Sequence, residues 1–199
     1  MAIINGYCTL SEVRLQLGYT NATDTANDAA IEKTIEAASR MIDNWCGRVF
    51  YESASDETRY YTPDHYGRIF TDDIRSITSI ATDGNGDRTY VTTWAATDYD
   101  LMPSALPPYT WIETAPGGDY SFPLSRMSVK IVGKFGYSET GSPPKPIVEA
   151  CLIQSIRLFK RTKDAPFGIA GASDMGQAIM IAKFDPDVEM LLTPYRRLV

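Results

Sequence analysis

Histidine and cysteine are scarce in this chain, whose 199 residues contain one histidine and three cysteines. Cys8, Cys46 and Cys151 are too few and too far apart in sequence for a disulfide framework or for the paired ligands of a structural zinc site. Cys46 and Cys151 lie among apolar residues, so we interpret both as small buried thiols. A fold held together by disulfides or by zinc is therefore not indicated.

Long apolar runs are also missing. No stretch approaches the roughly 18 consecutive apolar residues that span a bilayer. The segment Met1–Tyr7 lacks the basic residues and the long apolar run of a secretory signal. We therefore expect synthesis in the cytoplasm and no membrane partner.

Basic residues do not outnumber acidic ones. Lys and Arg total 19 against 25 Asp and Glu, which gives a formal net charge of −6. This balance argues against a general nucleic-acid binder, because such proteins neutralise phosphates with cations. With 44% hydrophobic and 22% charged residues, the chain can bury a core as one domain, or as one domain with a large insertion.

Motifs for catalysis are weak. The single histidine, His65, lies in a turn-like stretch beside Asp64, and no serine or cysteine stands in a Gly-x-Ser-x-Gly elbow. The glycine-rich stretch 168–176 is not followed by the Lys-Ser/Thr pair of a phosphate-binding loop. We predict no catalytic residues and no cofactor.

A calcium site is a poor fit to the segment Asp83–Thr89, although oxygen-bearing side chains alternate there. Arg88 and Trp94 stand where a calcium loop needs a glycine and a bidentate glutamate. The preferred interpretation is a hairpin turn with Gly84 and Gly86 at positive φ and no metal.

Two helices are predicted near the start. Thr9 and Glu12 have the spacing of a capping box, which begins a short helix that stops near Gly18. A longer helix ends at Gly47, and its apolar residues recur at the helical period: Ile31, Ile35, Ala38, Ile42 and Trp45. We expect Trp45 of this helix to be buried against a later helix, Ile147–Phe159.

The residues from about 51 to 143 lose the helical period and read as an antiparallel β-rich region. The candidate strands are Arg59–Thr62, Arg68–Thr71, Ile77–Thr82, Thr89–Trp94, Tyr109–Glu113 and Met127–Phe135. Alternation places every second aromatic in a core, and an oligomer, partner or sugar-binding face remains the alternative. The aromatics in question are Tyr60, Tyr61, Tyr66, Tyr90, Trp94, Tyr99, Tyr109 and Trp111.

Helix returns at Ile147–Phe159, which is apolar over most of its circumference. Its basic end is interpreted as a complement to the helix dipole, with DNA phosphate contact as the alternative. That end carries Arg157, Lys160, Arg161 and Lys163. Residues 164–183 show no regular element, and Asp185 with Pro186 begins a last short helix.

The predicted fold class is therefore α+β: a small helical bundle with a large antiparallel β insertion and an extended C-terminal segment. Residues 1–50 and 144–163 form the helical core, and residues 51–143 form the β-rich insertion. Residues 164–199 form a flexible segment and a C-terminal docking helix.

The order of these pieces resembles the head–tail connector (adaptor) proteins of long-tailed bacteriophages and gene-transfer particles. The resemblance spans nearly the whole chain, and each piece is weak alone. The pieces are Tyr7–Arg14, Ile31–Phe50, Ile74–Ile80, Asp98–Leu101, Val129–Tyr137, Pro146–Leu152 and Leu191–Leu198.

The resemblance implies a structural virion protein of the neck, between head and tail, that assembles as a dodecameric ring bound to the portal protein. The ring would extend the DNA channel and offer a platform for the next neck (stopper) or tail-completion protein. A negative lining would let DNA pass without specific binding, because like charges repel. Assembly would take place in the host cytoplasm.

The last helix is the predicted docking element. Its apolar stripe is too short for a helix stable on its own, so we expect it to insert into a groove on the portal or a neighbouring subunit. The predicted docking residues are Leu191, Leu192, Tyr195, Arg196 and Arg197. Two alternatives stay open for the whole chain: an aromatic-rich carbohydrate-binding or adhesion module, and an enzyme of unknown type that uses His65.

Overall fold

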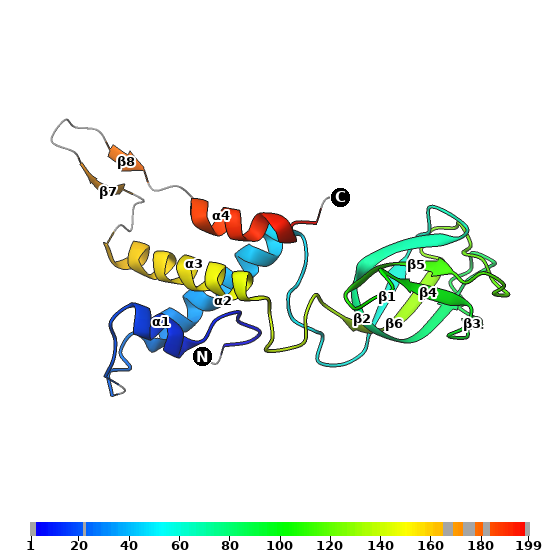
Figure 1. The fold of residues 1–199 in the computed structure, drawn as a ribbon, viewed down its shortest axis with the longest axis horizontal. Coiled ribbons are helices and arrows are strands. Elements are labelled where there is room, and N and C mark those ends of the chain that lie inside the picture. The colour runs from blue at the N-terminus through cyan, green and yellow to red at the C-terminus, as the bar shows by residue number, and fades with distance from the viewer. Residues whose placement is uncertain (1–2, 22, 165–168, 173–177, 181–183, 198–199) are drawn as a thin grey trace. The chain divides into compact units, whose positions relative to one another are not determined.

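The computed structural model describes residues 3–21, 23–164, 169–172, 178–180 and 184–197. The fold is α+β, as predicted, with helices and an antiparallel six-stranded sheet (Figure 1). The chain divides into a helical unit, residues 1–47 and 143–199, and a β unit, residues 48–142.

The first helix, α1 (Leu10–Gln16), begins at the predicted capping box. The Glu12 backbone N–H donates to Thr9 Oγ1 at 3.2 Å, and the Thr9 backbone N–H donates to Glu12 Oε2 at 2.7 Å. Two of the backbone donors that a helix start leaves without partners are thereby satisfied. Val13, on the inner side of α1, is fully buried.

The second helix, α2 (Asp28–Cys46), ends at Gly47, whose φ of 65° is the left-handed conformation that glycine adopts without strain. Its predicted apolar face is confirmed except at one position. Trp45 is half-buried, and Cys46, four residues after Ile42, continues the buried face instead. The residues with no exposed surface are Ile31, Ile35, Ala38, Ile42 and Cys46.

Trp45 packs on the C-terminal segment of the helical unit. Its indole stacks on the Phe184 ring with centroids 5.1 Å apart, and the Arg196 guanidinium lies 5.3 Å from the indole centroid. The prediction that Trp45 is buried against the Ile147–Phe159 helix is therefore wrong. The indole packs instead on the C-terminal segment, where it stays partly exposed.

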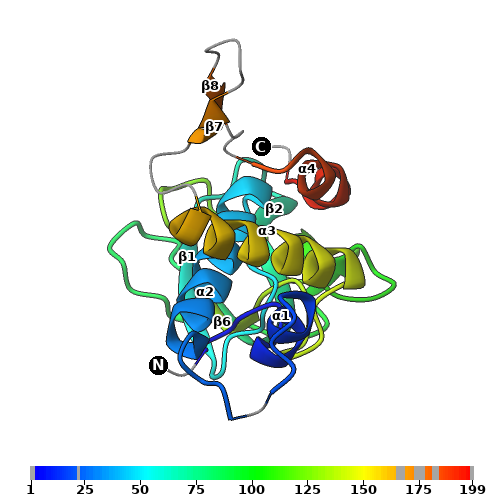
Figure 2. The ribbon, with the colours of Figure 1, turned by 90° about the vertical axis from the view of Figure 1, so that its left-hand side faces the viewer.

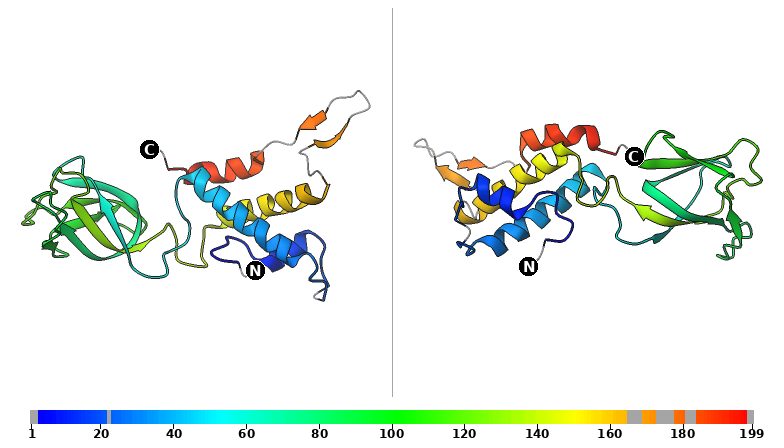
Figure 3. Two further views of the ribbon diagram at one scale, coloured as in Figure 1. Left: turned by 180° about the vertical axis from the view of Figure 1, so that it is seen from behind. Right: turned by 60° about the horizontal axis from the view of Figure 1, so that its bottom comes forward.

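The third helix, α3 (Lys145–Asp164), crosses α2 and packs against it (Figure 3). Figure 2 views the same unit with α3 in front of α2, and α1 packs on both. Ile147, Ala150 and Cys151 have no exposed surface. The helical core therefore forms where α1, α2 and α3 meet.

The C-terminal part of the helical unit contains α4 (Pro186–Leu192) and a 3-10 turn (Thr193–Tyr195). The predicted cap is confirmed: Asp185 Oδ1 accepts from the Asp187 backbone N–H at 3.0 Å, and Pro186 opens the helix. Val188 and Leu192 of α4 are fully buried, which makes α4 part of the helical core.

A short strand pair lies where the sequence predicted no regular element. Strands β7 (Ile169–Ala172) and β8 (Ala178–Met180) pair antiparallel, with Ile169 opposite Met180. The predicted flexibility of this region falls in part on residues 165–168, 173–177 and 181–183, which lie outside the described residues.

The β unit is an antiparallel sheet in the order β1-β6-β2-β5-β4, with β3 also paired to β2. Its strands are β1 (Glu57–Tyr61), β2 (Arg68–Thr82), β3 (Thr92–Trp94), β4 (Tyr99–Met102), β5 (Tyr109–Thr114) and β6 (Val129–Phe135). Two predicted strands, Arg68–Thr71 and Ile77–Thr82, are parts of the single long β2. The prediction missed β4, which is four residues long.

The long strand β2 organises the sheet by pairing with three others. One of its edges pairs with β5 as far as Ile74 and with β3 near Ile80, while the other edge pairs with β6. Register shifts interrupt these ladders, as β-bulges do where a strand bends. The bend lets β2 wrap one core formed by Ile69, Ile74, Ile80, Trp94, Ile112, Phe122, Val129, Ile131 and Phe135.

The loop between β2 and β3 is organised by one acidic side chain. Asp83 is 1% exposed, and its carboxylate accepts from the backbone N–H groups of Asn85, Gly86 and Arg88 at 2.7–3.0 Å. Burial alone would raise the pKa of Asp83, but these donors outweigh it and lower the pKa. Gly86 has the predicted positive φ of 76°, but the prediction is wrong for Gly84. The second residue of this loop in the left-handed region is Arg88, with a φ of 67°.

The two ends of the β unit run side by side. The Tyr137 backbone N–H donates to the Val49 carbonyl, and the Ser53 backbone N–H donates to the Phe135 carbonyl, each at 2.8 Å. Gly136 permits this approach, because a Cβ there would lie 2.0 Å from the Tyr51 carbonyl oxygen. Entry and exit of the β unit are thus paired by backbone hydrogen bonds.

Candidate functional site

His65, the residue on which the enzyme alternative depends, is a turn residue. Its imidazole is exposed, and Nδ1 accepts from the Gly67 backbone N–H at 3.0 Å. Asp64 is exposed as well. The ring nitrogen that could act as a base is occupied in closing the turn that leads into β2.

Metal-binding clusters are absent from the part of the chain that the structure describes: no three His, Cys, Asp or Glu side chains gather as ligands there. Within the same residues, no helix combines the length and apolar character needed to cross a membrane.

The predicted docking helix is held on its own unit at both ends. At its start, Arg157 of α3 forms an ion pair with Asp185, with Nη1 and Oδ2 2.7 Å apart. After the 3-10 turn, the Arg197 backbone N–H donates to the Cys46 carbonyl at the end of α2 at 2.7 Å. The Trp45–Phe184 stack adds a third contact between α2 and this segment.

These contacts separate the five predicted docking residues into two groups. Leu192 is fully buried within the helical unit, so its predicted insertion into a partner needs correction. Its spacing of four residues from Val188 turns both side chains toward the core. Leu191, Tyr195 and Arg197 are half-buried and Arg196 is exposed, and their role in docking stays a prediction.

Sequence reasoning missed Met190, which is 71% exposed on α4. It lies outside the predicted apolar stripe of Val188, Leu191, Leu192 and Tyr195, so periodicity gives no signal for it. Together with half-buried Leu191, it gives the outer side of α4 an apolar character.

The basic end of α3 is partly used in structure. Arg157 pairs with Asp185 at the α4 cap and is therefore not a free surface cation. Lys160 is exposed and Arg161 is half-buried. Because Arg157 is paired with the N-cap residue of α4, it is not available as one of the four cations predicted for DNA contact.

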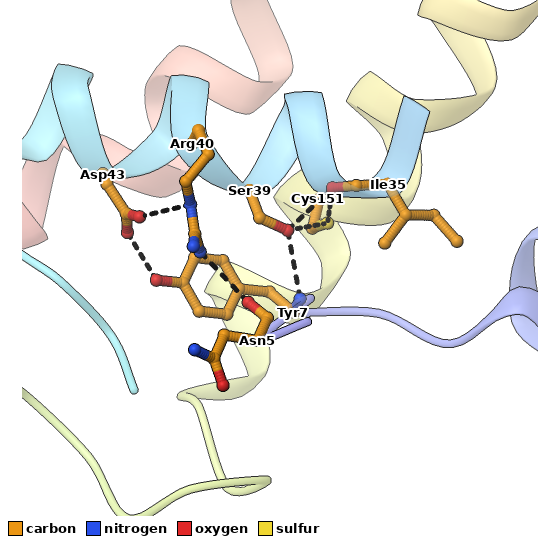
Figure 4. A network of polar contacts seen from close by, with 7 residues as sticks. All are labelled: Asn5, Tyr7, Ile35, Ser39, Arg40, Asp43 and Cys151. Carbon is orange, nitrogen blue, oxygen red and sulfur yellow. Dashed lines mark hydrogen bonds and ion pairs between the residues drawn. The ribbon is translucent and has the colours of Figure 1, made fainter. Parts of the chain in front are cut away.

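The N-terminal segment is fixed to α2 by a polar network (Figure 4). The Tyr7 backbone N–H donates to Ser39 Oγ at 3.1 Å, and the Tyr7 hydroxyl bonds to Asp43 Oδ1. Arg40 joins these groups: its guanidinium forms an ion pair with Asp43 at 2.9 Å and donates to the Asn5 carbonyl at 3.0 Å. The network positions the residue after Tyr7, Cys8, beside α3.

Two aromatic rings lie on the outer face of the β unit. Phe70 of β2 is 52% exposed and stands opposite Trp111 of β5, with ring centroids 6.5 Å apart. The Arg68 guanidinium lies 4.6 Å from the Phe70 centroid, and Trp111 Nε1 donates to Glu113 Oε1 at 3.0 Å. This aromatic face combines flat apolar rings with two charged side chains.

The remaining aromatics show that the core interpretation holds only for some. Trp94 is 4% exposed and stacks on Phe122, with centroids 4.6 Å apart. Tyr60 and Tyr66 are exposed. Tyr61, Tyr90, Tyr99, Tyr109 and Trp111 are half-buried.

Comparison with known proteins gives matches in structure only. No family model and no curated protein sequence matches the chain. A chain from the neck of an empty GTA particle, computed with C6 symmetry, matches with a TM-score of 0.59 and 18% identity over 100% of this chain and 94% of that one.

Two further structures match in the same way. A chain from the neck of a native GTA particle, computed with C12 symmetry, has a TM-score of 0.59 and 17% identity, covering 100% of this chain and 93% of its own. A chain from the virion of a native gene transfer agent (GTA) particle has a TM-score of 0.56 and 16% identity, with 100% and 94% coverage. The protein therefore shares its fold, over its full length, with chains of gene transfer agent particles.

Proposed function

We propose that this chain is a non-enzymatic structural protein of the neck of a phage-like or gene-transfer particle. The observation that carries the proposal is the structural match to chains from necks of GTA particles, which covers 100% of this chain. The turn role of His65 gives no support to catalysis.

The finer proposal is an adaptor ring of twelve copies beneath the portal. The C12 and C6 symmetries of the matched necks are compatible with twelve copies. A net charge of −6 suits a wall along which DNA slides, since a negative surface does not hold phosphates. The ring would extend the DNA channel and present a platform to the stopper or tail-completion protein.

We place portal docking on the outer side of α4. Leu191, Tyr195, Arg196 and Arg197 keep their predicted role, and Met190 joins them as the exposed apolar residue. Accessible apolar side chains on a helix fit a groove, and the arginines fit carboxylates at its rim. Leu192 and Val188 serve this surface indirectly by anchoring α4.

Negative-stain electron microscopy of the purified chain, alone and mixed with the portal assembly of the same particle, tests the proposal. We expect twelve-fold rings on the portal. Absence of both ring and portal binding contradicts it.

A matched pair of variants tests the docking surface. Met190→Glu should abolish portal binding, while Val91→Glu, at an equally exposed site in the β unit (both 71%), should leave it intact. Both variants should melt as the parent does, because neither side chain is part of a core. If the two variants bind the portal equally well, α4 is not the docking element.

A second candidate function, carbohydrate binding, is favoured by the aromatic face. Flat rings beside charged side chains, as at Phe70, Trp111 and Glu113, suit the apolar faces and hydroxyls of sugars. Titration with host-surface glycans, compared between the parent and Phe70→Ser, tests this. Binding that the substitution removes would support an adhesion role in place of a purely structural one.

A further inference from the structure

Two cysteines that are 143 positions apart in sequence meet inside the helical unit. Cys8 precedes α1, and Cys151 lies on α3, yet their Sγ atoms are 3.3 Å apart. Both are buried, at 5% and 0% exposure. A disulfide bond of about 2.05 Å requires the sulfur atoms to approach by only roughly 1.2 Å more.

We propose that Cys8 and Cys151 form a redox modification site, at which peroxide oxidation converts the buried thiol pair into an intramolecular disulfide. The proposal concerns the isolated chain and is independent of the neck role. It also goes beyond the sequence-based interpretation of Cys46 and Cys151 as small buried thiols.

The neighbouring hydrogen bonds determine which of the two thiols donates to the other sulfur. Ser39 Oγ lies 3.4 Å from Cys151 Sγ but donates its single proton to the Ile35 carbonyl at 2.8 Å. Ser155 Oγ lies 3.8 Å from both sulfurs and donates to the Cys151 carbonyl at 2.6 Å. The Cys151 thiol donates to the Ile35 carbonyl at 4.0 Å, which leaves the Cys8 thiol to donate to Cys151 Sγ.

This arrangement makes Cys151 the more acidic of the two thiols. The hydrogen bond from Cys8 lowers the pKa of Cys151, against the effect of burial. The same bond and burial raise the pKa of Cys8. Cys151 is thus the sulfur that begins the reaction, because thiolates and not thiols are the nucleophiles, and Cys151 forms its thiolate at lower pH than Cys8.

The chemistry balances with hydrogen peroxide as the oxidant, which is small enough to reach a site exposed by local opening. The Cys151 thiolate attacks one peroxide oxygen, the O–O bond breaks, and the departing hydroxide takes up a proton to leave as water. Cys151 is then a sulfenic acid. The Cys8 sulfur loses its proton and attacks the Cys151 sulfur, the S–O bond breaks, and a second water leaves as the S–S bond forms.

The structure supplies an internal control. Cys46 is fully buried too, but it lies on α2 against α4, with its sulfur 4.0 Å from the Leu192 carbonyl oxygen. Burial and residue type are therefore matched between Cys46 and the proposed pair, and only the neighbouring sulfur differs.

Tryptic mapping separates the three cysteines cleanly. Cleavage after Lys and Arg, but not before Pro, places Cys8 in fragment 1–14, Cys46 in fragment 41–48 and Cys151 in fragment 135–157. After hydrogen peroxide treatment, alkylation of remaining thiols and digestion without reductant, we expect fragment 1–14 joined to fragment 135–157. Their joint mass should lie two hydrogens below the sum of the free fragments, and fragment 41–48 should be alkylated.

Variants and a second readout complete the test. Cys46→Ser should form the cross-link as the parent does, and Cys8→Ser should not. The oxidised parent should melt at higher temperature than its dithiothreitol-reduced form, because the bond ties the segment before α1 to α3. Alkylation of all three cysteines after peroxide treatment, or a cross-link that contains fragment 41–48, would overturn the proposal, and neither result depends on whether a variant folds.

Discussion

Replacement of Leu192 by alanine tests whether α4 is part of the core of its own unit or becomes packed only when a partner binds. Leu192 has no exposed surface, and only one other side chain of α4, that of Val188, is equally buried. Deleting a fully buried leucine to alanine costs about 2–5 kcal/mol, which combines the lost transfer free energy with the cavity that remains. For this anchor we expect a loss of about 3 kcal/mol in the free energy of unfolding.

The shortness of α4 sets an upper limit on this loss. A seven-residue helix has little stability of its own, so a weakened anchor lets the segment detach before the whole unit unfolds. The measured loss then equals the free energy with which α4 is held. That free energy includes the Arg157–Asp185 ion pair and the Trp45–Phe184 stack as well as the two anchors.

Urea unfolding followed by far-ultraviolet circular dichroism measures the effect, because this signal reports chiefly on the helical unit. The midpoint should fall while the slope stays constant if only stability has changed. Met190→Ala is the matched control on the same helix, and its exposed side chain should cost less than about 0.5 kcal/mol. A Leu192→Ala protein that unfolds within that same margin of the parent would refute the core assignment of α4.

Three further predictions test other parts of the fold. Trp45→Ala should lower the free energy of unfolding by about 1–2 kcal/mol in urea melts, because the substitution removes one stacked ring and one cation–π contact of a half-buried indole. This is less than the roughly 3–5 kcal/mol typical of a fully buried tryptophan, and a loss above about 3 kcal/mol would contradict the reasoning. Thr9→Ala should cost about 1 kcal/mol through loss of the α1 cap, and Thr9→Ser should restore most of it. The lowered pKa of Asp83 means that its stabilising effect is present above the unfolded-state pKa of about 4 and is lost as pH falls through the folded-state pKa. The melting temperatures of the parent and Asp83→Asn should therefore differ at pH 7 and converge in acid, with no rise on addition of calcium; a gap that widens in acid would show the wrong sign.

Local signals in the sequence predicted the element boundaries well. The Thr9–Glu12 capping box, the stop at Gly47 and the Asp185–Pro186 start each depend on a few neighbouring residues. Such patterns act through backbone hydrogen bonds and φ preferences that need no tertiary context. For this reason they could be predicted without knowledge of the fold.

The failures required knowledge of what packs on what. Periodicity identified the stripe of the last helix, but a stripe does not reveal whether its own domain or a partner covers Leu192. Periodicity places Trp45 on the buried face, because no local pattern predicts the stacking of Phe184 on its indole. The Cys8–Cys151 contact was out of reach for the same reason, since the whole β unit separates the two residues in sequence.

The paired ends of the β unit have a consequence for how the chain folds during synthesis. The apolar face of α2 ends at Cys46, but α3, which covers it, is complete only at Asp164. At about 5–20 residues per second, α2 leaves the ribosome roughly 6–24 s before its partner. During that interval the isoleucines of α2 are not packed against α3.

A β unit that folds as soon as it emerges shortens the search that follows. Formation of the Val49–Tyr137 backbone pair brings the start of α3, eight residues beyond Tyr137, close to the chain that leaves α2. Formation of the sheet has then already compensated the entropy cost of closing the long intervening loop, and only a short loop has to close for α3 to contact α2. An insertion that folds first thus brings α3 close to the apolar face of α2, before the two helices pack.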